Sequence, residues 1–255
     1  MSSLTGPTGS ARIGVIAGWG IMATMGAGFL LAQIIPPPGP YDAHTTARYF
    51  HDYLDLKRLG IICVIVAGTM MIPFGAAVAD RLRRVEGVGT TAANTELGAA
   101  IASATLLMVF GPMVLVGLQR PDMPESTYQL INHATWMAWG GLWEPGALQA
   151  VATATAIFCD KSPSPVFPRW FGWYSLFMAF GSLMGSLIPF FTGGPFAWNG
   201  AVGFFVAAMV YFAWFAIMLT QLHLVCRRGS VQGPDLNPVV ASDAPAKPAT
   251  AEAMS

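Results

Sequence analysis

The stretch LGIICVIVAGTMMIPFGAAVA, from Leu59 to Ala79, contains no charged residue, and three arginines follow it at positions 81, 83 and 84. An α-helix of about 20 apolar residues is long enough to cross the roughly 30 Å hydrocarbon core of a bilayer. Clusters of Lys and Arg flank membrane-spanning helices mainly on the cytoplasmic side. This stretch therefore predicts a membrane-spanning helix whose C-terminal end lies in the cytoplasm.

Five further stretches are as long and contain no Lys or Arg. They cover residues 13–35, 97–118, 136–158, 171–191 and 200–225. By the same length argument, each of them predicts a helix that crosses the membrane. The expected fold is therefore all-α: a polytopic bundle of six transmembrane helices within residues 11–228.

The composition agrees with a membrane protein and excludes other classes. Of the 255 residues, 54% are hydrophobic and 10% are charged, whereas soluble proteins contain about 25% charged residues. The thirteen basic and thirteen acidic side chains balance, so there is no basic excess that would bind nucleic acid. The three cysteines are far apart and do not have the spacing of a disulfide framework or a zinc site.

The basic residues beside the six stretches predict the orientation of the chain. With the N-terminus in the cytoplasm, eight of them flank the inner ends and four flank the outer ends. The inner ones are Arg12, Arg81, Arg83, Arg84, Lys161, Arg169, Arg227 and Arg228, and the outer ones are Arg48, Lys57, Arg58 and Arg120. Because basic residues are enriched inside, both termini are expected in the cytoplasm. Residues 1–10 and 229–255 are rich in small and polar residues, which is typical of disordered tails.

A short helix is predicted after the first span. Three prolines at positions 36–38 end the preceding helix. Ala43, Ala47, Phe50 and Leu54 then recur at helical spacing and form one apolar face. This pattern is typical of an amphipathic helix that lies on a membrane surface, here the outer one.

Glu144 is the one residue inside the six stretches that is Asp, Glu, Lys or Arg. A carboxylate facing lipid costs at least a few kcal/mol, so we expect this side chain to face protein or a water-filled cavity. At successive steps of three or four residues from Glu144 on the predicted helix lie Gly140, Gly141, Ala147, Val151 and Thr155. Such small residues allow another helix to approach closely. Glu144, with Gly140 and Gly141, is therefore the candidate site for binding a ligand or a proton; the alternative is a structural hydrogen bond between helices.

The predicted outer surface contains candidate metal ligands. His51 and Asp55 are four residues apart, which places both on one side of a helix, and His133 belongs to the same predicted surface. The alternative is that all three are solvated interfacial residues. No two histidines are expected at one membrane depth, so a haem held by two histidines is not indicated. No cofactor is otherwise suggested by the sequence.

Several motifs resemble a family of uncharacterised multispan membrane proteins of bacteria. They are PPP at 36–38, FPRWFGW at 167–173 and PFFTGGPFAWNG at 189–200. The likeness covers most of residues 11–228. It implies a helical fold and a location in the bacterial cell membrane, the inner membrane where there are two. It implies no activity and no catalytic residue.

Three functions are consistent with these features. The first is binding or transport of a small apolar or lipid-like molecule, with Glu144 as polar anchor or proton carrier. The second is an accessory subunit of a larger membrane complex or a homo-oligomer, because small-residue faces favour helix association. The third is a membrane enzyme that uses the outer histidines and acids. The sequence contains no nucleophile motif, phosphate-binding loop or cofactor fingerprint, so the enzyme is the least favoured.

Overall fold

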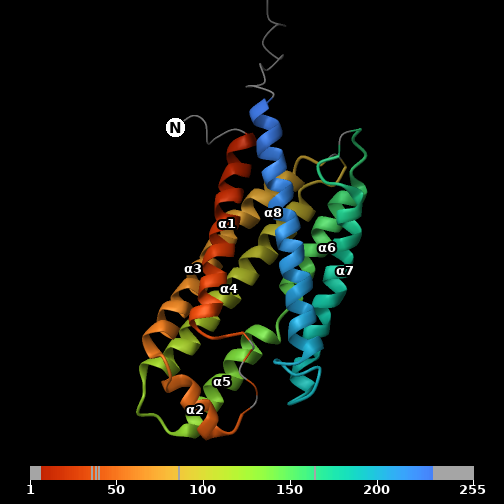
Figure 1. Ribbon diagram of the computed structural model, residues 1–255. Coiled ribbons are helices and arrows are strands. Elements are labelled where there is room, and N and C mark those ends of the chain that lie inside the picture. The colour runs from red at the N-terminus through yellow and green to blue at the C-terminus, as the bar shows by residue number, and fades with distance from the viewer. Residues whose placement is uncertain are drawn as a thin grey trace, which may run out of the picture.

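The computed structural model describes residues 7–231 apart from residues 36, 38, 40, 86 and 164, and this part of the chain is a helical bundle (Figure 1). The helices are α1 (Pro7–Leu31), α2 (Ala43–His51), α3 (Leu54–Leu82), α4 (Thr91–Gln119), α5 (Glu125–Gly140), α6 (Glu144–Cys159), α7 (Arg169–Leu183), the 3-10 helix η2 (Met184–Phe190), the π-helix η3 (Ala201–Val206) and α8 (Ala207–Val231). α1 begins and α8 ends inside the predicted tails, and the rest of both tails lies outside the described residues.

Five helical segments among the described residues are long and apolar enough to cross a membrane. They are Gly9–Leu31, Leu54–Leu82, Thr91–Gln119, Arg169–Phe190 and Ala201–Leu224. Each corresponds to one of the six predicted stretches. The prediction of an all-helical chain with several membrane-compatible helices is therefore confirmed.

The prediction of one continuous helix over residues 136–158 is wrong. α5 ends at Gly140, and α6 begins at Glu144. Pro145 has no N–H to donate to the carbonyl of Gly141, and its ring disfavours the preceding helical turn. The two successive glycines also favour helix poorly. The apolar composition gave no sign of the break because the residues that form it are themselves mostly apolar.

The long helices close into a ring. α1 packs on α3, α3 on α4, α4 on α6 and α6 on α7, while α8 contacts both α7 and α1. Figure 1 shows α8 in blue between the α1–α3–α4 side and the α6–α7 side. The helices around this ring therefore enclose an interior.

α1 and α3 approach so closely that their backbones touch. A Cβ atom at Gly60 of α3 would lie 2.5 Å from the backbone nitrogen of Ala32 and 2.8 Å from the carbonyl oxygen of Gly28. Small residues at helix contacts allow this kind of backbone approach in membrane proteins. Gly60 is therefore a position at which any side chain would force the two helices apart.

The predicted amphipathic helix is present as α2. Asp42 precedes it, and its Oδ1 accepts a hydrogen bond of 3.0 Å from the backbone N–H of Thr45. The hydrogen bonds from the backbone and hydroxyl of Thr45 lower the pKa of Asp42. Thr46, Ala47 and Phe50 are buried, and α2 packs on α5. α2 ends at His51, so Leu54 of the predicted apolar face belongs to α3 instead. An amphipathic helix at the outer membrane surface stays a prediction.

Gly60→Ala is expected to destabilise the bundle by about 1–3 kcal/mol, because the new methyl group would overlap the backbone of α1. The measurement is the thermal unfolding midpoint of the purified protein in detergent. Gly98→Ala is the matched control, since a Cβ at Gly98 would meet nothing within 4 Å. Equal midpoints for the two variants would contradict the close α1–α3 contact.

Candidate functional site

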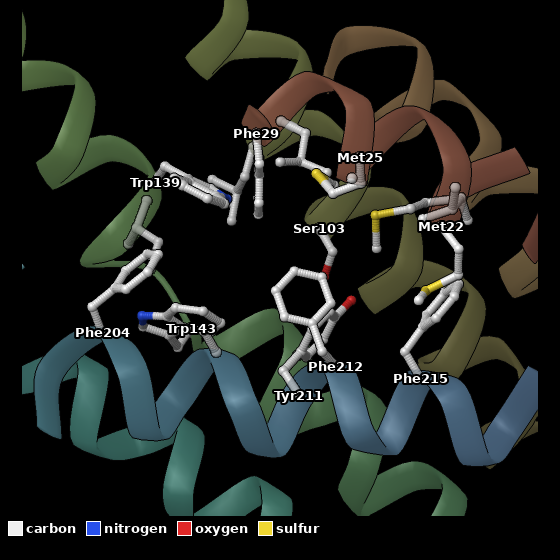
Figure 2. Close-up of a pocket in the computed structure, with 18 of the residues that line it drawn as sticks. Met22, Met25, Phe29, Ser103, Trp139, Trp143, Phe204, Tyr211, Phe212 and Phe215 are labelled. Atoms are coloured by element: carbon white, nitrogen blue, oxygen red, sulfur yellow. The ribbon is translucent and has the colours of Figure 1, made fainter. Parts of the chain in front are cut away.

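A cavity of about 300 Å³ lies inside the ring of helices. Its walls come from α1, α3, α4, α5, α6 and α8, together with η3 and the break between α5 and α6. Figure 2 shows Met22, Met25 and Phe29 of α1 facing Phe212 and Phe215 of α8 across it. Almost all of its lining side chains are apolar, so the cavity suits an apolar molecule.

Two hydroxyl groups form the polar part of the wall. Ser103 of α4 and Tyr211 of α8 both line the cavity. In Figure 2 their oxygen atoms point toward each other. Ser103 also donates from Oγ to Oε1 of Gln149 on α6, over 3.3 Å. The polar wall therefore continues from the cavity into the contact between α4 and α6.

A buried carboxyl group ends this series of hydrogen bonds. Nε2 of Gln149 donates to Oε1 of Glu96 over 3.0 Å, and Oγ1 of Thr153 donates to Oε2 over 3.4 Å. Glu96 and Thr153 are 0% exposed, and Gln149 is 2% exposed. No basic side chain of the described residues forms an ion pair with Glu96. We call Ser103, Gln149 and Glu96 the polar chain.

The helices position the polar chain through simple spacing. Gln149 and Thr153 are four residues apart on α6, so their side chains lie on one face, and that face packs on α4. The ring of Tyr211 packs on α6 at Gly146, which leaves room for it. A Cβ at Gly146 would lie 3.0 Å from Cε2 of Tyr211.

Trp143 contributes a further nitrogen near the cavity. Its side chain lines the cavity, and its Nε1 is buried with no hydrogen-bond partner among the described residues. The Cδ1–Nε1 edge of the indole packs on Gly185 of η2. This donor therefore faces η2 and is separate from the polar chain.

Glu144 is exposed, whereas the sequence predicts that its side chain is enclosed. It is the first residue of α6, its side chain is exposed, and its Oε1 accepts a hydrogen bond of 2.7 Å from Oγ of Ser186. Of the small-residue face predicted around it, Val151 is 42% exposed and Thr155 is also exposed. The expectation of an enclosed carboxyl group at Glu144 is wrong, because the break before α6 leaves this face of the helix pointing outward.

Gly140 and Gly141 also lie outside the cavity wall. Both are buried. A Cβ at Gly140 would lie 3.8 Å from Ile188 and from Trp198, and one at Gly141 would lie 3.8 Å from Pro189. These glycines therefore sit at the contact of α5 with η2 and the segment after it, where they serve packing.

Glu96 was missed because the third predicted stretch begins one residue later, at Leu97. The structure extends this helix back to Thr91. Its first turns bury a face made of Ala92, Ala93, Glu96, Ala99 and Ala100. A glutamate at helical spacing within an alanine face is a signal that the sequence contains, and it indicates a buried carboxyl group.

The candidate metal ligands do not come together. Nε2 of His51 lies 3.1 Å from the hydroxyl of Tyr128, Asp55 pairs with Arg58 over 3.1 Å, and Nδ1 of His133 lies 2.8 Å from the carbonyl of Gln129. Within the described part of the chain, no three His, Cys, Asp or Glu side chains are grouped as a metal site requires. The geometry gives no support to a metal site or to an enzyme that uses one.

Comparisons with protein-family models, with curated proteins and with solved structures found no match. The resemblance to a bacterial family therefore stays a prediction.

Glu96→Ala is expected to destabilise the protein by about 1–3 kcal/mol for each buried donor that it leaves unpaired, here those of Gln149 and Thr153. Glu96→Gln should cost less, because an amide can still accept one of these hydrogen bonds. Thermal unfolding in detergent measures both. Glu144→Ala is the control, since exposed side chains contribute little; a larger loss there than at Glu96 would contradict the burial of the polar chain.

Proposed function

We propose that this protein is a polytopic protein of the bacterial cell membrane that binds a small apolar or lipid-like molecule in the central cavity. The cavity is the observation that carries the proposal. Ligand sites measure about 300–1,000 Å³ and are mostly apolar, with a few placed polar groups. A cavity of about 300 Å³ with two hydroxyls on one wall fits that description.

Six crossings and a cytoplasmic location of both termini are part of the proposal. α5 and α6 together would form an interrupted sixth crossing. Non-helical backbone is tolerated at membrane depth where it lines a cavity or is buried in protein, and Leu142 and Trp143 of the break line the cavity. Figure 1 supports an even number of crossings, because the start of α1 and the end of α8 lie at the same end of the bundle.

The route into the cavity supports a lipid-like ligand. Met22, Ile35 and Leu142 line the cavity and are 38%, 56% and 45% exposed, so the cavity reaches the surface of the bundle. In a membrane this surface would meet the lipid chains. An apolar molecule dissolved in the bilayer could therefore enter sideways without passing through water. The polar anchor we propose is the Ser103–Tyr211 pair in place of Glu144.

A brominated long-chain alcohol tests the proposal, because bromine quenches tryptophan fluorescence and Trp139 and Trp143 line the cavity. Saturable quenching is expected in the purified protein. Gly26→Phe should weaken binding about tenfold or more, because Gly26 lines the cavity and a Cβ there meets nothing within 4 Å, so the ring can occupy the ligand's space.

Gly98→Phe is the matched control: Gly98 is also an exposed helical glycine with free space around it, and it does not line the cavity. It should bind the alcohol like the unmodified protein. Quenching that does not saturate would overturn the proposal, and so would equal affinity in the Gly26 variant.

A further inference from the structure

The hydroxyl of Ser103 has its one proton committed. Its Oγ donates to Oε1 of Gln149 over 3.3 Å, and Gln149 lies outside the cavity wall. A serine hydroxyl has a single proton to donate and two lone pairs that accept. The proton therefore points into the contact between α4 and α6, and Ser103 offers its lone pairs to a molecule in the cavity.

The amide of Gln149 is held in the orientation that this requires. Its Nε2 donates to Oε1 of Glu96 over 3.0 Å, which leaves its oxygen for Ser103. Oε2 of Glu96 lies 3.4 Å from Oγ1 of Thr153. Oε1 accepts from Nε2 both when the carboxyl group is ionised and when it carries a proton on Oε2, because its lone pairs are free in either state. The amide therefore has the same direction in both states.

Burial makes this direction hard to reverse. If the amide were turned around, the oxygen of Gln149 would face the lone pairs of Oε1 of Glu96. The two residues are 2% and 0% exposed, so water would not satisfy the groups left without a partner. Unpaired buried donors and acceptors are costly. The polar chain therefore stabilises one arrangement of donors, and that arrangement ends at the cavity.

We propose that the polar chain fixes Ser103 as a hydrogen-bond acceptor in the cavity, so that the cavity selects apolar molecules that carry a hydrogen-bond donor, alcohols above all. The inference rests on the proposed function of the cavity. Glu96 and Gln149 are positioning residues in it: neither lines the cavity, and together they determine what Ser103 offers.

The rest of the wall favours an alcohol over other donors. The hydroxyl of Tyr211 can both donate and accept, so a ligand hydroxyl can donate to Ser103 and still accept a hydrogen bond. An ether or a ketone has no proton for Ser103. The residues that line the cavity include no Asp, Glu, Lys or Arg, and burying a charge without a partner is costly. A charged donor such as an ammonium group is therefore disfavoured.

Three matched probes test the inference: a long-chain alcohol with bromine at the far end, its methyl ether, and the bromoalkane without the oxygen. Saturable quenching of tryptophan fluorescence gives the affinity of each probe for the purified protein. The alcohol should bind about five- to tenfold more tightly than the ether, as expected for one hydrogen bond. The bromoalkane should bind no more tightly than the ether. Comparing the alcohol-to-ether ratio between variants in one detergent cancels the partitioning of the probes into micelles.

Ser103→Ala removes the acceptor and should bring the affinities of the alcohol and the ether to within about twofold of each other. The matched control is Ser182→Ala. Ser182 is also a helical serine; it is 0% exposed and does not line the cavity. This variant should retain the preference for the alcohol.

Gln149→Met tests the positioning role. Without the amide oxygen, the proton of Ser103 is free to turn toward the cavity, so the ether should bind about fivefold more tightly than to the unmodified protein. The alcohol should change little, whereas general damage to the α4–α6 contact would weaken both probes. Glu96→Met should act in the same direction, because it releases the amide of Gln149 to turn.

A preference for the alcohol that persists in Ser103→Ala would overturn the inference, as would an ether affinity that does not rise in Gln149→Met. Equal and saturable binding of the alcohol and the ether to the unmodified protein would also overturn it, while the cavity would remain a site for apolar molecules. If none of the three probes binds saturably, the proposed function fails and the inference fails with it.

Discussion

Gln149 and Thr153 of α6 donate hydrogen bonds to the carboxyl group of Glu96 on α4. These bonds fix how α6 packs on α4, and the positions of the cavity and of Glu144 depend on that packing. Glu96 is 0% exposed, so water does not reach its carboxyl group and the protein must supply its hydrogen-bond partners. These two contacts decide which face of α6 points inward. Because Gln149 and Thr153 face α4, the side of the helix that carries Glu144 and Val151 must face outward.

The break between α5 and α6 makes that orientation possible. A continuous helix would tie the rotation of α6 to that of α5, whereas three residues between them allow α6 to turn independently. The same break opens space: Leu142 and Trp143 lie in it and line the cavity. The break at Pro145, where helical hydrogen bonds are lost, thus forms part of the wall of the cavity that can hold a ligand.

Much of the fold could be predicted because a membrane-spanning helix is defined by length and apolarity, which are properties of the sequence alone. Five stretches qualified on that basis and are helices of membrane-spanning length. Details that depend on packing could not be predicted in this way. Glu144 was expected to be enclosed because it lies in the middle of an apolar stretch, and it is exposed. Glu96 lies at the edge of another stretch and is 0% exposed, since α6 covers it.

The length of the polar chain distinguishes a structural carboxyl group from one connected to the cavity. The hydrogen bonds from Gln149 and Thr153 are enough for the carboxyl group of Glu96. When buried ionic residues are replaced by well-packed apolar ones, the protein is often no less stable. Stability therefore does not require that the chain continue to Ser103. Yet it does continue, and the hydroxyl-bearing side chain of Ser103 lines the cavity. The extension means that a change at the buried carboxyl group alters the hydrogen bonding that a molecule in the cavity meets, and this is the property that a binding or transport protein can use.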